Sequence, residues 1–202
     1  DLKIVAIIQA RMGSSRLKGK SMMDICGEPL LLKVLKQVNG SSFLDDLIVA
    51  TTYRKEDEEI RLFCKDNNYK VCRGSTENVL SRFFKAAKLT NADIIVRITG
   101  DCPLIAPDTI DEIIDVFLRS KYDYICNTNP YTRPEGQDVE VFSFKALKKA
   151  YLEAYEKTDL EHVTLFLKKN KFISKLNFIH RFYDFSNLKL SVDTLSDLKF
   201  IR

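Results

Sequence analysis

Apolar runs and helical repeats alternate along the first two-thirds of the chain. Residues 3–8 form a nearly continuous apolar run, which is typical of a strand buried on both faces. Residues 29–38 begin with Pro and repeat Leu and Val at helical spacing. The same two patterns recur and predict strands at 47–52, 69–72, 92–98 and 122–126, and helices at 56–67, 77–88 and 107–120. This alternation predicts an α/β fold with a mostly parallel sheet and helices on both faces, in which ligands bind at the carboxyl ends of the strands.

The pattern changes after residue 126. Residues 127–137 are rich in turn formers, and residues 139–144 alternate like a strand with one solvated face. The pattern next predicts helices at 145–156 and 160–169, strands at 172–180 and 188–192, and a short helix from Leu195. The chain is therefore expected to be one domain, 1–202, with residues 127–186 as a small inserted α+β subdomain.

Composition excludes several classes of protein. With 45% hydrophobic residues, 7 Gly and 5 Pro among 202 residues, the chain is neither disordered nor collagen-like. No apolar run approaches the roughly 20 residues that span a bilayer, and residues 1–10 do not resemble a signal peptide, so a cytoplasmic protein without a membrane partner is expected. The net charge of +4 is spread along the chain, which argues against nucleic acid and fits one anionic substrate.

The five cysteines do not indicate a metal site. No pair has CxxC spacing, and the two histidines, His162 and His180, lie far from any cysteine pair. Free, buried thiols are the prediction.

The loop after the first predicted strand carries the clearest chemical signal. Residues 9–21 combine glycines for close backbone approach, hydroxyls and four cations: Gly13, Gly19, Ser14, Ser15, Arg11, Arg16, Lys18 and Lys20. Backbone amides and fixed cations at a strand end suit a polyphosphate; a solvated basic loop is the alternative. Gly19-Lys20-Ser21 resembles the end of a P-loop, but the required first glycine falls at Ser14 and no helix is predicted next, which argues against a P-loop.

Several blocks in order resemble the sugar-activating cytidylyltransferases, above all the spore-coat polysaccharide biosynthesis protein F family, with the acylneuraminate and ketodeoxyoctulosonate cytidylyltransferases as relatives. The blocks are Ala10-Arg11-Met-Gly13-Ser14-Ser-Arg16-Leu-x-Gly19-Lys20, Cys26-Gly-Glu-Pro-Leu30, Arg73-Gly74 with Asn78-Val-Leu80 and Arg82, Arg97-Ile-Thr-Gly-Asp-Cys-Pro-Leu104, Gly136-Gln-Asp-Val-Glu140, Glu161-His-Val-Thr164 and Ser191-Val-Asp-Thr194. They span nearly the whole chain. Lys18 and Asn78 depart from the family pattern, which usually has Pro and an acidic residue there.

The resemblance implies a Rossmann-like nucleotide-diphospho-sugar transferase fold. It also implies transfer of a cytidylyl group from CTP to a sugar, sugar acid or sugar phosphate, with Mg²⁺ and release of pyrophosphate, in a homodimer formed through residues 127–186, which also bind the acceptor. It assigns catalysis to Lys20, Arg11 and Asp101, and nucleotide binding to Gln9, Ala10, Arg11, Gly13, Ser14, Arg16, Lys20, Gly74 and Arg82. Arg97, Asp138 and Glu140 are the candidate acceptor-binding residues.

Two aspartates are the candidate metal ligands. Asp101 and Asp193 each follow a predicted strand, so the fold should bring both to the carboxyl edge of one sheet. Mg²⁺ needs one or two protein carboxylates, and the resemblance assigns both to it, although Asp after a strand often caps a turn.

The remaining candidates have ordinary structural interpretations as well. Arg97 can pair with a local carboxylate, and Asp138 and Glu140 can lie on a solvated face. A lone histidine such as His162 is more often structural than catalytic.

Three other functions compete with cytidylyl transfer. A glycosyltransferase of related fold would use a metal-bound Asp-x-Asp, but Asp101-Cys-Pro lacks the second Asp. The second competing function is that of a protein that binds a nucleotide without catalysis, and the third is that of a P-loop kinase.

Overall fold

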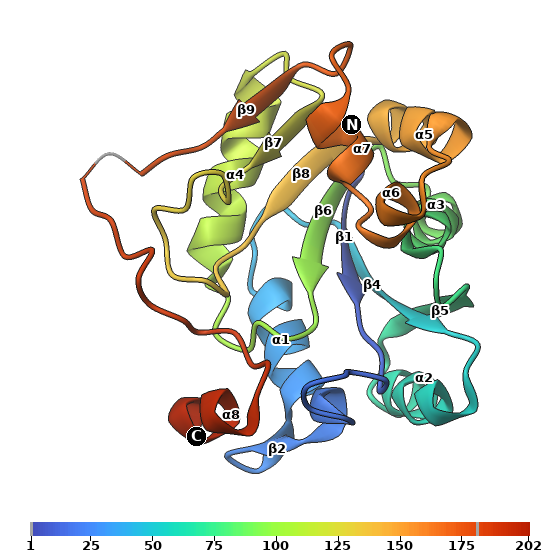
Figure 1. Ribbon diagram of the computed structural model, residues 1–202, viewed down its shortest axis with the longest axis vertical. Helices are drawn as coiled ribbons and strands as arrows, with labels where there is room; N and C mark the ends of the chain where they lie inside the picture. Colours follow the sequence, from blue (N-terminus) through green and yellow to red (C-terminus); the bar gives the residue numbers. More distant parts are fainter. Residues whose placement is uncertain (1, 181) are drawn as a thin grey trace.

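A seven-stranded sheet forms the centre of the computed structural model, which describes residues 2–180 and 182–202 (Figure 1). Four neighbouring strands are parallel, and β8 runs antiparallel to both of its neighbours. The order is β5 (Lys70–Gly74), β4 (Asp46–Thr52), β1 (Ile4–Gln9), β6 (Ile94–Thr99), β8 (Glu140–Ser143), β7 (Tyr124–Cys126) and β9 (Lys175–Asn177). A separate hairpin pairs β2 (Asp24–Ile25) with β3 (Glu28–Pro29).

Helices cover both faces because the buried strands send alternate side chains to each. In β1, Ile4, Ala6 and Ile8 join one core, while Val5 and Ile7 join the other. The first core packs α1 (Leu30–Asn39), α2 (Glu58–Asp66), α4 (Pro107–Arg119) and α8 (Leu195–Ile201). The second packs α3 (Val79–Thr90), α5 (Phe144–Glu153) and α7 (Leu165–Lys169), with α6 (Lys157–Glu161) against α3. The predicted α/β fold is confirmed.

The carboxyl ends of the parallel strands meet at one edge of the sheet. The arrowheads of β1 and β6 point to this edge, where the loop after β1 and the segment before α8 lie (Figure 1). The loop after β1 leads into a short 3-10 turn, Lys20–Met22, and then the β2–β3 hairpin. No long helix follows the loop, which agrees with the argument against a P-loop.

Four local predictions are wrong. The strand at 139–144 has no solvated face, because Val141 packs into one core, Phe142 packs into the other, and Glu140 is buried as well. Residues 188–192 form no strand; a single bridge joins Lys189 to Glu135.

The predicted helix at 160–169 is divided into α6 and α7, because Val163 has a φ of 48° between them. The cap of α3 is Asn78, whose side chain accepts a hydrogen bond from the Ser81 amide, rather than Ser75 or Thr76. Asn78 therefore has a structural role at this departure from the family pattern.

Residues 127–186 contribute β8 and β9 to the central sheet. Their predicted role in acceptor binding and dimerisation stays a prediction. In the part of the chain that the structure describes, no helix is long and apolar enough to cross a membrane. The cysteines are free; four are buried as predicted, whereas Cys26 is exposed.

Candidate active site

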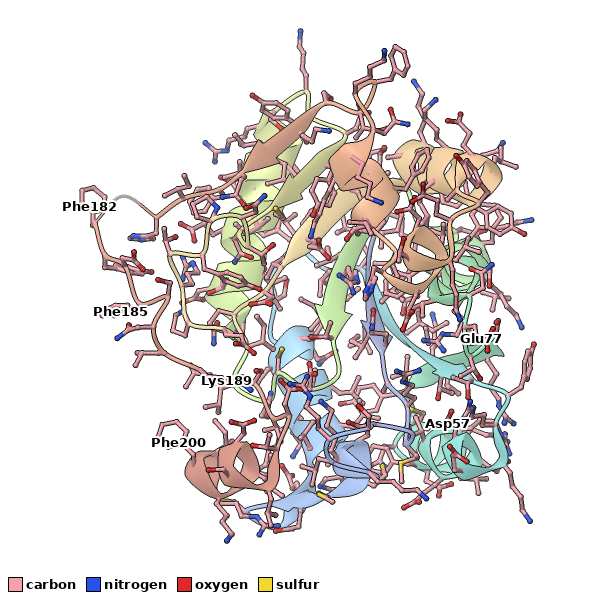
Figure 2. The ribbon with its side chains drawn as sticks, viewed as in Figure 1. Asp57, Glu77, Phe182, Phe185, Lys189 and Phe200 are labelled. Carbon is pink, nitrogen blue, oxygen red and sulfur yellow. The ribbon has the colours of Figure 1, made fainter. Side chains whose placement is uncertain are left out.

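A buried carboxylate fixes the loop that follows β1. Asp57 is fully buried at the end of the 3-10 turn Lys55–Asp57, and it accepts a hydrogen bond from the Met12 amide at 2.7 Å. Its other oxygen accepts one from the Thr52 hydroxyl. Figure 2 shows Asp57 beside α2, at the edge where the loop lies. Sequence reasoning missed Asp57, because its partner is a backbone amide 45 positions away and no motif marks that contact.

Backbone contacts within the loop complete its shape. Gly19, at a φ of 74°, donates its amide to the Met12 carbonyl at 2.8 Å. The Ser21 hydroxyl donates to the Arg11 carbonyl at 3.2 Å. The loop is thus held in a defined path rather than as a solvated basic segment.

A cavity of about 280 Å³ lies between this loop, α3 and the ends of β1 and β6. Most of the predicted nucleotide and metal residues line it. The lining comprises Gln9, Ala10, Arg11, Ser14, Ser15, Arg16, Lys20, Ser21, Val79, Arg82, Thr99, Gly100, Asp101, Glu161, His162 and Asp193. Gly13 and Gly74 are absent from this lining: Gly13 packs towards Glu56, and Gly74 lies behind Arg82.

The ammonium of Lys20 joins the two predicted metal ligands. Its Nζ lies 2.9 Å from Asp101 Oδ2 and 3.1 Å from Asp193 Oδ1, and donates to the Val192 carbonyl at 2.8 Å. The Val192 amide in turn donates to the Asp101 carbonyl at 2.8 Å, which links the two aspartate segments through their backbones. Although burial opposes it, hydrogen bonds from Lys20 and Lys189 hold the pKa of Asp193 below its ordinary value. The Asp101 and Asp193 carboxylates therefore flank one position, and the positively charged Lys20 ammonium occupies it.

The donor set suits Mg²⁺. Asp101 and Asp193 supply hard carboxylate oxygens on either side of the Lys20 ammonium. Among the described residues, no three His, Cys, Asp or Glu side chains gather into a metal cage. Mg²⁺ is commonly held by one or two carboxylates, with waters and substrate phosphates completing its shell, so the pair fits that ion.

Arg82 is a second cation on the cavity wall, and it is only 2% exposed. Its Nη1 donates to the Ser75 carbonyl at 3.0 Å, whereas its Nε is buried without a hydrogen-bond partner. Burial, reinforced by nearby Arg11, lowers the pKa of Arg82 to about 10. Gly74 leaves room for it, since a Cβ there would lie 2.6 Å from Arg82 Cγ.

Residues 5–201 match the profile of the family described as cytidylyltransferase. The chain belongs to the cytidylyltransferase family. It is 32% identical to the spore coat polysaccharide biosynthesis protein SpsF of Bacillus subtilis over 208 residues, which cover 98% of this chain and 85% of SpsF. A cytidylyltransferase structure from Leptospira borgpetersenii superposes with a TM-score of 0.92 at 32% identity, covering 98% of this chain and 84% of the other. Membership confirms the predicted family and the nucleotidyltransferase class of enzyme.

A more distant structure shares the fold. CMP:2-keto-3-deoxy-manno-octonic acid synthetase complexed with CTP has a TM-score of 0.74 at 19% identity, covering 98% of this chain and 96% of that one. Both predicted metal residues of this cytidylyltransferase, and all of its predicted nucleotide residues except Gly13 and Gly74, line the same cavity.

The candidate acceptor residues of the cytidylyltransferase line a neighbouring cavity of about 110 Å³, which shares Thr99 with the first. Arg97 pairs with Glu140 and also donates to Gln9 Oε1 at 3.1 and 3.2 Å. Glu140 is 4% exposed, so its predicted solvated face is wrong. Burial opposes its ionisation, but Arg97 and Lys168 outweigh burial and bring the pKa of Glu140 to about 2.

Asp138 also lines this smaller cavity. It accepts hydrogen bonds from the Tyr131 hydroxyl at 3.1 Å and the Gly136 amide at 3.2 Å. Burial raises the pKa of Asp138 above its ordinary value. Acceptor binding by Arg97, Asp138 and Glu140 stays a prediction.

His162 lies at the cavity wall rather than in the core. It follows α6, is exposed, and lines the larger cavity together with Glu161. The structural role expected for this histidine is therefore not one of core packing.

Proposed function

We propose that this protein transfers a cytidylyl group from CTP to a sugar-type acceptor, with a bound Mg²⁺ and release of pyrophosphate. The observation that carries the proposal is the Asp101–Lys20–Asp193 cluster beside the anchored loop after β1. SpsF is named for polysaccharide biosynthesis, and the synthetase of the same fold is named for making a CMP-activated sugar acid with CTP. Both names support a sugar-type acceptor.

The reaction needs charge neutralisation more than covalent help. A nucleophilic oxygen of the acceptor forms a bond to the α-phosphorus while the bond from that phosphorus to the bridging oxygen breaks, and pyrophosphate leaves. Mg²⁺ held by Asp101 and Asp193 would neutralise triphosphate charge and orient it for this displacement. Lys20, Arg11 and Arg16 surround the same cavity and stabilise the negative charge that develops on the leaving group.

The smaller cavity is the proposed acceptor site. It opens beside Thr99 and offers the Asp138 carboxylate with the hydroxyls of Thr128 and Tyr131, groups that hydrogen-bond to sugar hydroxyls. A homodimer and a cytoplasmic location are part of the same proposal, on the strength of the resemblance.

Pyrophosphate release tests the proposal directly. The purified protein with Mg²⁺ is given CTP, UTP, GTP or ATP and either a pool of 2-keto-3-deoxy sugar acids or a pool of sugar phosphates and neutral sugars. We expect release with CTP and one pool, and loss of release in Asp101→Asn. The matched control is Asp115→Asn, which removes a carboxylate from the exposed side of α4, where it pairs with Arg119. Calorimetry with CTP alone provides a readout that needs no acceptor. Full activity of Asp101→Asn, or no binding of any nucleotide, would overturn the proposal.

A further inference from the structure

Two carboxylates line the smaller cavity, and one of them keeps capacity for a ligand. Both oxygens of Glu140 are engaged by protein side chains, which are Arg97, Tyr124, Thr164 and Lys168. Asp138 is only partly buried and accepts hydrogen bonds from two neutral donors, the Tyr131 hydroxyl and the Gly136 amide. Within residues 2–180 and 182–202, no cationic side chain forms an ion pair with Asp138. Asp138 is therefore the carboxylate of this cavity that a ligand can reach.

The segment that carries Asp138 is anchored to the loop that carries Asp101. The neighbouring side chain of Gln137 reaches across to that loop. Its Nε2 donates to the Leu104 carbonyl at 2.5 Å, and its Oε1 accepts from the Ala106 amide at 2.9 Å. These two hydrogen bonds fix the position of Asp138 relative to the loop after β6.

Two further contacts hold the same segment on its other sides. The Val139 amide donates to the side chain of Asn127 at 2.9 Å. A Cβ at Gly136 would lie 2.7 Å from the Ser191 nitrogen, so the backbone here packs directly on the chain that leads to Asp193. The fold thus holds the segment between the two stretches of chain that carry the predicted metal ligands.

The two cavities meet at Thr99, the last residue of β6. In the proposed function, the triphosphate occupies the larger cavity beside Lys20 and Asp101, and the acceptor occupies the smaller one. The acceptor oxygen therefore meets the α-phosphorus near Thr99, with Asp138 on the acceptor's side of this junction. A hydroxyl oxygen loses its proton as it bonds to phosphorus, so that side of the site needs a group that takes the proton.

We propose that Asp138 is the general base of the reaction, which takes the proton from a hydroxyl of the acceptor. The inference rests on the proposed function. As the proton passes to a carboxylate oxygen of Asp138, the hydroxyl oxygen forms its bond to the α-phosphorus. The bond from that phosphorus to the bridging oxygen breaks, and its electron pair leaves with pyrophosphate. Glu140 does not have this role, because both of its oxygens already accept from other side chains.

The electrostatic environments of the two carboxylates support this division of roles. Burial raises the pKa of Asp138 above its ordinary value, reinforced by the negative charges of Glu135 and Glu140. Although burial opposes it, Arg97 and Lys168 lower the pKa of Glu140 to about 2. A general base is most effective when its pKa lies near the working pH, so Asp138 is the better proton acceptor of the two.

The test follows single turnovers of radiolabelled CTP, with the enzyme in excess, from acidic to alkaline pH. The acceptor is the pool that supports pyrophosphate release by the wild type. Asp138→Asn keeps an oxygen that accepts a hydrogen bond but takes no proton. We expect its rate to fall by about 10²–10⁴, with a much smaller change in the acceptor concentration that gives the half-maximal rate. The wild-type rate should fall at acidic pH as Asp138 is protonated, and Asp138→Asn should lack this acidic limb.

Two control variants separate Asp138 from other carboxylates. Asp115→Asn, on the exposed side of α4, should keep both the rate and the acidic limb. Glu135→Gln removes a carboxylate on the same segment and should keep the acidic limb. The titratable or charged side chains around Asp138 are Arg97, Cys102, Tyr131, Glu135, Glu140 and Lys168. Calorimetry with CTP shows whether each variant keeps a folded nucleotide cavity.

Formate supplies a readout that a structural role would not change. In Asp138→Ala the missing side chain leaves space for a small carboxylate, so added formate should restore part of the rate. Formate should restore none of the rate in Asp101→Asn.

Several results would overturn the role of Asp138 while the proposed function stands. These are an unchanged rate in Asp138→Asn, an acidic limb that this variant retains, or a change only in the half-saturating acceptor concentration. A wild-type rate without an acidic limb does so without any variant. Turnover only with acceptors that attack through a phosphate oxygen does so as well, because that oxygen carries no proton to remove. A wild-type protein that releases no pyrophosphate with any nucleotide and pool would overturn the proposed function itself.

Discussion

Lys20→Met is the substitution with the clearest expected energetic effect. The methionine keeps an apolar stem of similar length and removes the ammonium between Asp101 and Asp193. The three side chains are 12%, 26% and 13% exposed, so they lie between a buried and a surface ion pair. Breaking a buried pair is worth about 3–5 kcal/mol and a surface pair at most about 1 kcal/mol, so we expect a loss of about 2–3 kcal/mol of unfolding free energy. For a chain of this size that lowers Tm by about 4–12 °C.

The same substitution should leave the position between the Asp101 and Asp193 carboxylates free for a metal ion. Without the ammonium, the two carboxylates repel each other, and a divalent ion relieves that repulsion. We therefore expect Mn²⁺ to raise the Tm of Lys20→Met in the absence of nucleotide much more than that of the wild type. Turnover of CTP should fall by about 10²–10³, the usual loss for one group that stabilises transition-state charge.

Differential scanning fluorimetry gives the Tm values, and electron paramagnetic resonance of free Mn²⁺ gives the affinity. Lys121→Met, which removes an exposed ammonium remote from the cavity, is the control and should melt with the wild type. If Lys20→Met had wild-type stability and wild-type Mn²⁺ affinity, the Lys20 ammonium would not occupy the cation position, and the reasoning would be refuted.

Three further outcomes can be measured. In steady-state assays, Asp57→Ala should raise the KM for CTP more than it lowers kcat, because the Met12 amide in the loop loses its buried partner. The same loss should reduce stability by about 1–3 kcal/mol. Asp57→Asn keeps one acceptor, so its KM should lie between those of the wild type and Asp57→Ala. Glu140→Gln should be about 3–5 kcal/mol less stable at pH 7. Because the pKa of Glu140 is lowered to about 2 from 4.5, its stabilisation is complete above pH 4.5 and is lost towards pH 2, so urea unfolding should show the deficit shrinking over that window. In alkylation followed by mass spectrometry at pH 8, Cys26 should react first, while Cys64 and Cys72, whose pKa values burial raises to about 12 and 11, stay unlabelled until the protein unfolds.

The parallel half of the fold could be predicted because consecutive residues in the sequence carry the pattern of each strand. β1, β4 and β6 each contain a run of apolar residues, Ile4–Ile8, Leu47–Ala50 and Ile94–Val96, and that pattern is typical of a strand covered on both faces. β8 misled the prediction, since its Glu140 reads as a solvated position but lies between Arg97 and Lys168. A polar residue whose ion pairs come from distant elements looks exposed in the sequence.

The candidate site divides in the same way. The loop after β1 carries its chemistry in consecutive residues, so its cations and hydroxyls could be assigned before the fold was known. Asp57 could not be found, because its function depends on a backbone amide that the fold brings near it. Asp193 was placed correctly at the sheet edge for an incorrect reason. Residues 188–192, directly before Asp193, form no strand. The segment is held instead by the hydrogen bond from the Val192 amide to the Asp101 carbonyl.

That backbone bond has a consequence for the order in which the protein is made. Every strand of the central sheet lies before residue 178, whereas Asp193 lies on the segment that leads into α8. A nascent chain can therefore form its complete sheet on the ribosome while one of its two carboxylates is still inside the exit tunnel. Domains tend to fold from the N-terminal side as they are synthesised, so the sheet becomes a template on which the final segment docks. If Asp193 holds the metal ion as proposed, a product that stops short of it should form the sheet without catalysing cytidylyl transfer.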